Sequence, residues 1–187
     1  MKIILLRHGK PDFKIPKYIA SKEIVKAIDL YDKAGIASDS IPSQKSINVA
    51  NNVKVIICSH LPRSLQSAQK LTEKDIYLSD KLFREASLPS SNSVFPKLPP
   101  MAWFTIFRIL WLLGYTKNGE SITVTRQRAK QATEKLIEIA EQHQQVLLVG
   151  HGVFNHLIAT ELKKQGWNTS KKSPRKHWEY ASYINGY

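Results

Sequence analysis

Cysteine is almost absent from this chain, because Cys58 is the only one among 187 residues. A single thiol forms neither an internal disulfide nor a cysteine-based zinc cluster, so disulfide scaffolds and zinc modules of that kind are excluded. Long apolar runs are also lacking. The longest, from Met101 to Leu113, contains Arg108 and is shorter than the roughly 20 residues of a membrane span. The apolar run at residues 3–6 is too short for the core of a signal peptide. We therefore expect a cytoplasmic protein with no membrane span.

Acidic residues are scarce, with 15 Asp and Glu against 28 Lys and Arg. The resulting net charge of +13 favours anionic partners, although a polymer, a bilayer and a small phosphate all remain open. The hydrophobic fraction of 42% and the charged fraction of 23% are typical of a folded protein and argue against disorder. A chain of this length fits one domain. The composition predicts a single globular domain over residues 1–187.

Short runs of leucine and β-branched residues are typical of strands that are buried on both faces of a parallel sheet. Such runs occupy residues 2–6, 53–58 and 145–149, and the aromatic-rich segment 178–183 is a fourth candidate. Helical patterns lie between them, at residues 61–71, 125–142 and 153–164. Strands that alternate with helices predict an α/β fold, a three-layer α/β/α sandwich with a mostly parallel sheet.

A segment rich in serine and proline, Ser87 to Pro100, interrupts this alternation. Its composition predicts an extended loop, which leads into an apolar helix over residues 101–113 that ends at Gly114. We expect residues 87–119 to form an insertion that acts as a lid over one end of the sheet. Contact of its apolar helix with a membrane or a partner is the alternative.

Charged and polar residues follow the three strands directly. Arg7-His8-Gly9 follows the first strand, Ser59 to Arg63 follows the second, and Gly150-His151-Gly152 follows the third. Ligands bind at the carboxyl ends of strands in open parallel sheets, and the helix N-terminus at Arg63 attracts anions. Taken alone, each histidine would more often be structural and Arg63 more often solvated. Their combination predicts a site for a phosphate-type dianion. A metal site on His8 and His151 is disfavoured, because the arginines repel cations and no acidic or cysteine ligand is near.

Five motifs in this chain resemble, in the same order, those of the histidine phosphatase superfamily, which includes the phosphoglycerate mutases. They are LLRHGK at residues 5–10, SHLPRSLQSA at 59–68, LFREASL at 82–88, NGES at 118–121 with Arg128 after it, and LLVGHGVFNHLIA at 147–159. The resemblance implies a phosphoglycerate mutase-like fold.

The resemblance also implies roles for individual residues. His8 would be the nucleophile that becomes phosphohistidine, while Arg7, Arg63 and His151 would bind the transferring phosphoryl group. Glu85 would protonate the leaving oxygen and then activate water. A nucleophilic histidine must be neutral, and neighbouring guanidinium groups favour that state. Because fixed cations can stabilise the charge of phosphoryl transfer, we expect no cofactor and no metal.

The chain departs from the family pattern at several positions. Lys10 stands where many relatives have an acidic or small polar residue, and Lys14 where many mutases carry asparagine. Both lysines are therefore candidates to contact the substrate or to support the site. Asp80 is the alternative acid, since the sequence after Glu85 lacks a motif common in relatives. Glu120 is expected either to support the site or to be an ordinary acid at a helix start.

These features favour a phosphatase that acts on a small phosphorylated metabolite through phosphohistidine. A phosphoglycerate mutase-type phosphotransferase is the first alternative, but the 87–119 lid is short for shielding phosphohistidine from water. A non-catalytic basic module that binds nucleic acid or anionic lipid is the second. The sequence lacks the alternation of aromatic and basic residues found in RNA-binding modules, so no nucleic acid is expected. The basic stretch 163–177 is expected to be a solvated face or loop, and the oligomeric state stays open.

Overall fold

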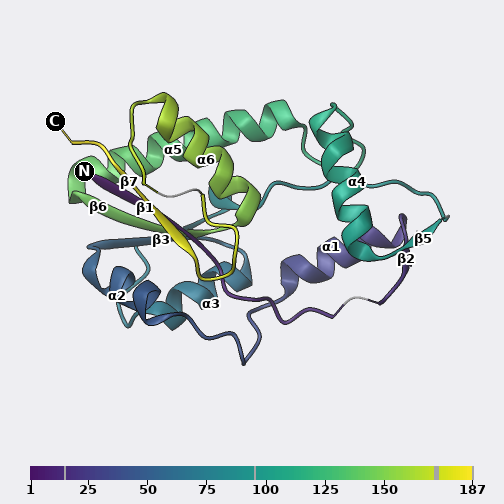
Figure 1. Cartoon of the computed structure of the whole chain (residues 1–187), viewed down its shortest axis with the longest axis horizontal. Helices are drawn as coiled ribbons and strands as arrows, with labels where there is room; N and C mark the ends of the chain where they lie inside the picture. The colour runs from purple at the N-terminus through teal and green to yellow at the C-terminus, as the bar shows by residue number, and fades with distance from the viewer. Residues whose placement is uncertain (15, 95, 171–172, 187) are drawn as a thin grey trace.

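The computed structural model describes all of residues 1–187 except 15, 95, 171–172 and 187. A five-stranded sheet forms its centre, with the order β4-β3-β6-β1-β7 (Figure 1). Its strands are β1 (Lys2–Arg7), β3 (Val55–Ser59), β4 (Leu78–Asp80), β6 (Gln145–Gly150) and β7 (Tyr180–Ile184). Neighbours pair in parallel from β4 to β1, and only the edge strand β7 pairs antiparallel, with β1.

Helices cover both faces of this sheet. The helices are α1 (Glu23–Lys33), α2 (Gln44–Asn52), α3 (Pro62–Leu71), α4 (Pro100–Leu112), α5 (Ile122–His143) and α6 (Gly152–Lys164), with a short 3-10 helix η1 (Lys81–Phe83). On β1, Ile3 and Leu5 pack into the core beneath α5 and α6, whereas Ile4 and Leu6 pack into the core beneath α2 and α3. This arrangement confirms the expected three-layer sandwich with a mostly parallel sheet.

Most of the elements expected from the sequence are present with small shifts of their ends. The fourth candidate strand begins at Tyr180 rather than Trp178, because Trp178 has a φ of 65° and cannot extend a strand. The short elements α1, α2, β2 (Ile19–Ala20), β4 and β5 (Lys97–Leu98) were not expected. Helices α1 and α2 each bury only two residues.

A separate group of elements lies beyond one end of the sheet (Figure 1). We call α1, β2, β5 and α4 the covering lobe, because they share a core of their own. That core contains Ile19, Ile24, Ala27, Trp103 and Phe107. Strand β5 and helix α4 lie within residues 87–119, and β5 pairs antiparallel with β2. The lobe therefore joins two segments that are far apart in the sequence.

Helix α4 ends as its sequence predicts. The amide of Gly114 donates to the carbonyl of Trp111, and the amide of Tyr115 donates to that of Leu110. Gly114 has a φ of 96°, the left-handed conformation that glycine adopts without strain at a helix end. Across the described part of the chain, none of the helices has both the length and the apolar character needed to cross a bilayer.

Candidate active site

Two histidines meet at the carboxyl edge of the central sheet. His8 follows β1 and His151 follows β6, and these strands are adjacent and in register at Arg7 and Gly150. The two imidazole rings lie 5.0 Å apart, and both side chains are almost fully buried. Burial holds the pKa of each ring well below its ordinary value of 6.5, and the nearby arginines lower both further. Both histidines are therefore neutral at pH 7.

The backbone selects the tautomer of His8. Its Nδ1 lies 2.7 Å from the carbonyl oxygen of Gly9. Because a carbonyl oxygen only accepts hydrogen bonds, Nδ1 carries the proton and the lone pair is on Nε2. A side chain at position 9 would not fit this turn, since a Cβ there would lie 2.3 Å from the ring of Trp178. The turn thus presents a neutral imidazole whose Nε2 is basic.

Arg63 lies in the first turn of α3 and is completely buried. Its terminal nitrogens donate to the carbonyl oxygen of Tyr31 at 2.9 Å and to Asp32 at 3.0 Å. The guanidinium also lies over the ring of Tyr31, 4.3 Å from its centroid. The end of α1 in the covering lobe therefore fixes the position of Arg63, an arrangement that the sequence analysis missed.

Several buried nitrogen atoms at this edge have no hydrogen-bond partner among the described residues. They are Nε of Arg7, Nε of Arg63, and both ring nitrogens of His151. Buried polar groups are nearly always hydrogen-bonded. The unpaired nitrogens at this edge of the sheet therefore indicate a ligand-binding site. A ligand with several acceptor oxygens, such as a phosphate group, matches this set.

The segment before β7 contacts the turn that carries His8. The amide of Trp178 donates to the carbonyl of Arg7 at 2.9 Å, and Nδ1 of His177 donates to the carbonyl of His8 at 3.0 Å. The rings of His177 and His8 lie 5.4 Å apart. A side-chain nitrogen of Arg7 also donates to the carbonyl of Arg175. The end of the 163–177 stretch is a loop with Arg175 and Lys176 exposed, as expected, and it also contacts the turn that carries His8.

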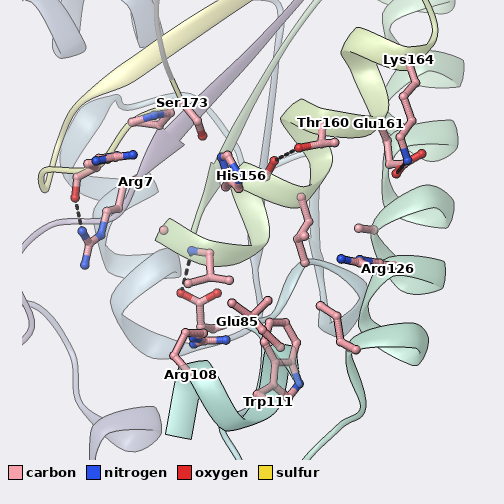
Figure 2. Close-up of a pocket in the computed structure, with 18 residues that line it drawn as sticks. Arg7, Glu85, Arg108, Trp111, Arg126, His156, Thr160, Glu161, Lys164 and Ser173 are labelled. Carbon is pink, nitrogen blue, oxygen red and sulfur yellow. Dashed lines mark hydrogen bonds and ion pairs between the residues drawn. The ribbon is translucent and has the colours of Figure 1, made fainter. Parts of the chain in front are cut away.

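Glu85 lies at the start of α6, the helix that directly follows His151 (Figure 2). Its carboxylate accepts hydrogen bonds from the backbone amides of Phe154 at 2.9 Å and Val153 at 3.3 Å. The N-terminus of a helix attracts negative charge, so this position suits a carboxylate. The candidate acid and the second histidine are therefore brought together by the first turn of one helix.

A buried ion pair holds the segment that carries Glu85. Arg128 and Glu120 form two hydrogen bonds, of 3.0 Å and 2.8 Å, and their side chains are only 8% and 9% exposed. Arg128 also donates to the carbonyls of Leu82 and Arg84 at 2.9 Å. Burial alone would raise the pKa of Glu120, but the hydrogen bonds and charge of Arg128 lower it overall. Arg128 thus links Glu120 to the backbone of the segment that carries Glu85.

The remaining candidates are Asp80, Lys10 and Lys14, and of these Lys10 is close enough to His177 for its charge to lower the pKa of that ring. Asp80 accepts from the amide of Leu82 at 2.8 Å and so caps η1. Lys10 is exposed, with its ammonium 3.6 Å from Asp39, and Lys14 is exposed as well. None of the three lines the cleft described below. The described residues contain no group of three or more metal-ligating side chains placed to hold a metal ion.

A cleft of about 740 Å³ opens beside Arg7 and Glu85 (Figure 2). Arg7, Glu85 and Gly152 form its wall next to the histidine pair, and residues of α4, α5 and α6 form the rest. A space of this size is typical of small-molecule sites. The cleft therefore starts at the candidate catalytic residues and continues along α6.

The histidine phosphatase superfamily (branch 1) family model matches residues 48–183. The match includes Arg63, Glu85 and His151, whereas Arg7 and His8 precede it. A search of curated proteins finds no significant match.

Solved structures match the fold over most of its length. A phosphoserine phosphatase variant from Entamoeba histolytica, in complex with phosphoserine, is 18% identical with a TM-score of 0.59, covering 98% of this chain and 90% of that one. The alpha-ribazole phosphatase from Shigella flexneri is 15% identical with a TM-score of 0.62, covering 97% and 89%. A mycobacterial glucosyl-3-phosphoglycerate phosphatase is 18% identical with a TM-score of 0.56, covering 87% and 79%. At these identities the likeness establishes a shared fold.

Proposed function

The chain belongs to the histidine phosphatase superfamily, and from this membership we propose that it is a metal-independent phosphatase that hydrolyses a small phosphorylated metabolite through phosphohistidine. The observation that carries the proposal is the neutral His8, whose Nδ1 is bonded to Gly9 and whose Nε2 therefore has the free lone pair. The phosphatase names of the structural neighbours agree with this assignment.

In the first step, Nε2 of His8 attacks the phosphorus atom of the monoester. An N–P bond forms and the ester P–O bond breaks, while the proton on Nδ1 stays hydrogen-bonded to the Gly9 carbonyl. The leaving oxygen takes a proton from Glu85, whose carboxyl group lies at the start of α6.

Charge on the transferring phosphoryl group is stabilised by fixed donors. Nε of Arg7, Nε of Arg63 and a ring nitrogen of His151 are buried and free to donate. In such a dry environment these interactions are stronger than in water, and they need no reorganisation during the reaction. The contacts of Arg63 with Tyr31 and Asp32 hold its guanidinium in place before substrate arrives.

In the second step, water attacks the phosphohistidine. Glu85, now ionised, takes a proton from the water, the N–P bond breaks, and His8 returns to its neutral form. We assign residues 87–119 as a lid insertion within a single domain over 1–187, since α4 lines the cleft through Arg108 and Trp111. The lid would shape the substrate site while leaving water enough access for hydrolysis.

Phosphate release from 4-nitrophenyl phosphate, with a chelator present, tests this function. We expect turnover that persists in the chelator, together with a phosphoprotein that is trapped by rapid alkaline quenching. Both signals should disappear in His8→Ala and remain in His60→Ala, whose side chain is exposed. Turnover that requires an added metal, or that survives loss of His8, would contradict the proposal.

A further inference from the structure

The cleft beside Glu85 continues well past the groups that would hold the phosphoryl unit. Its wall includes Arg7, which directly precedes His8, and Glu85, the proposed proton donor to the leaving oxygen. From there the cleft follows α6 past His156 and Thr160 (Figure 2). A leaving group of only a few atoms would fill a small part of about 740 Å³. The substrate's remainder therefore lies between α6 and the α4–α5 wall.

The charged side chains of the cleft are mostly cationic. The cations are Arg7, Arg108, Arg126, Lys164 and Arg175, and the acids are Glu85 and Glu161. The acids are already engaged, since Glu161 pairs with Lys164 at 2.7 Å and Glu85 accepts from backbone amides. Among the described residues, neither Arg108 nor Arg126 forms an ion pair with an acid. The charge of Glu85 acts on Arg108 and raises its pKa against the effect of burial, whereas Arg126 has no acidic partner among the described residues.

These two arginines lie on different walls of the cleft. Arg108 comes from α4 and lies next to Glu85, with its guanidinium 4.8 Å from the ring centroid of Trp111 (Figure 2). Its Nη1 is buried without a hydrogen-bond partner among the described residues, and burial lowers the pKa of the guanidinium. Arg126 comes from α5, is exposed, and lies farther from Glu85 in Figure 2.

We infer that the substrate is a phosphomonoester whose leaving group carries a second anionic group, and that Arg126 binds this group in the cleft. The assignment rests on the proposed function and adds the class of substrate to it. Apolar side chains, among them Trp111, Ile122 and Leu157, line the space between the two charged regions. A leaving group with an apolar middle and a carboxylate or phosphate at its far end would match the apolar lining followed by the cationic one.

Matched pairs of substrates test the assignment. Each pair consists of an ω-carboxyalkyl phosphate and its methyl ester, in a series of increasing chain length, so that the two members differ by one charge. At the best chain length, we expect the wild-type protein to prefer the carboxylate about tenfold in kcat/KM. The preference should decrease at about 0.5 M salt, because the Arg126 side of the cleft is open to solvent.

Variants on α5 identify the residue responsible. Arg126→Gln should bring the ratio of kcat/KM values close to one, mainly through a higher KM for the carboxylate, and Arg126→Lys should keep most of the preference. Lys130→Gln is the matched control, because Lys130 is exposed on the same helix and does not line the cleft. It should leave both substrates and their ratio unchanged.

Two results would overturn this assignment while leaving the proposed function intact. One is equal hydrolysis of acid and ester by the wild type, in a reaction that His8→Ala abolishes. The other is an unchanged preference in Arg126→Gln. Loss of the proposed function has a different signature, since no substrate of the series and no aryl phosphate would then be hydrolysed in a His8-dependent way.

Discussion

The two ends of the proposed active site are built differently. At the phosphate end, His8, Arg63 and His151 are each 1% exposed or less, and each directly follows a strand or opens the helix after one. At the cleft end, Glu85 and Arg108 are only partly buried and Arg126 is exposed. These residues come from a connecting segment, from the covering lobe and from the surface of α5.

This difference separates chemistry from selectivity. The sheet and its close-packed core position the phosphate end, so its groups have little freedom to move or to be replaced. The cleft end depends on side chains whose substitution leaves the core intact. Changes at the phosphate end should therefore remove activity, whereas changes at the cleft end should alter which substrate is used.

The largest effect is expected for His8→Ala, which removes the proposed nucleophile. Turnover should fall by about 10⁴-fold or more, as measured by phosphate release under saturating substrate. His60→Ala and His143→Ala are the controls, because His60 is exposed and His143 is partly exposed. Both variants should keep most of the wild-type activity. Retention of activity within about tenfold in the His8 variant would break the assignment of the phosphate end.

Glu85→Gln should have the next largest effect, and it should depend on the leaving group. Loss of a positioned acid costs about 10²–10⁴ in rate when the leaving group is an alcohol. Nitrophenolate needs little protonation, so formation of the phosphoenzyme from its ester should change much less. The two esters should be compared on the first turnover, because in the proposed mechanism Glu85 also serves as the base in dephosphorylation. An equal loss on both esters would assign Glu85 a structural role and turn attention to Asp80 or Glu120.

The third prediction concerns the buried pair that holds the Glu85 segment. Arg128→Leu leaves Glu120 buried without its main partner, which should lower the free energy of unfolding by about 3–5 kcal/mol. Lys135→Leu removes the exposed pair with Glu138 on the same helix and should cost less than about 1 kcal/mol. Urea denaturation of both variants checks the contrast. Similar losses in the two would show that burial of the Glu120 pair is unimportant.

The last prediction is a pH dependence of stability. The pKa values of His8, His151 and His177 are lowered, mainly by burial, so these groups take up protons on unfolding as the pH falls below 6.5. Their contribution to stability is fully present above pH 6.5 and is lost as the pH falls from there toward the folded-state pKa values. Each histidine adds a slope of at most about 1.4 kcal/mol per pH unit.

Denaturation curves between pH 8 and 5 measure this slope. The lowered pKa of Glu120 affects the free energy of unfolding only as the pH falls below about 4.5, which lies outside this range. His151→Gln should reduce the slope while keeping the plateau above pH 7. A slope that is the same in the variant would mean that His151 is not the buried neutral group described above.

The phosphate end was largely predictable from the sequence. Strand identity follows from short apolar runs, and parallel strands align their carboxyl ends at one edge. Residues that directly follow such strands therefore meet, as His8 and His151 do at 5.0 Å. This inference needs only local sequence and the general geometry of a parallel sheet.

The contacts that hold the phosphate end in place, and the whole cleft, depend on tertiary structure. His177 reaches the carbonyl of His8 across 169 residues of sequence, and Asp32 reaches Arg63 across 31. His177 lies in the basic stretch 163–177 and Asp32 near the end of α1, but neither segment's own sequence shows which distant residue it contacts. Likewise, Arg108 and Arg126 share a cleft only because α4 and α5 pack around α6. Local sequence encodes which element a residue belongs to, whereas contacts between distant elements depend on how their surfaces pack in the folded chain.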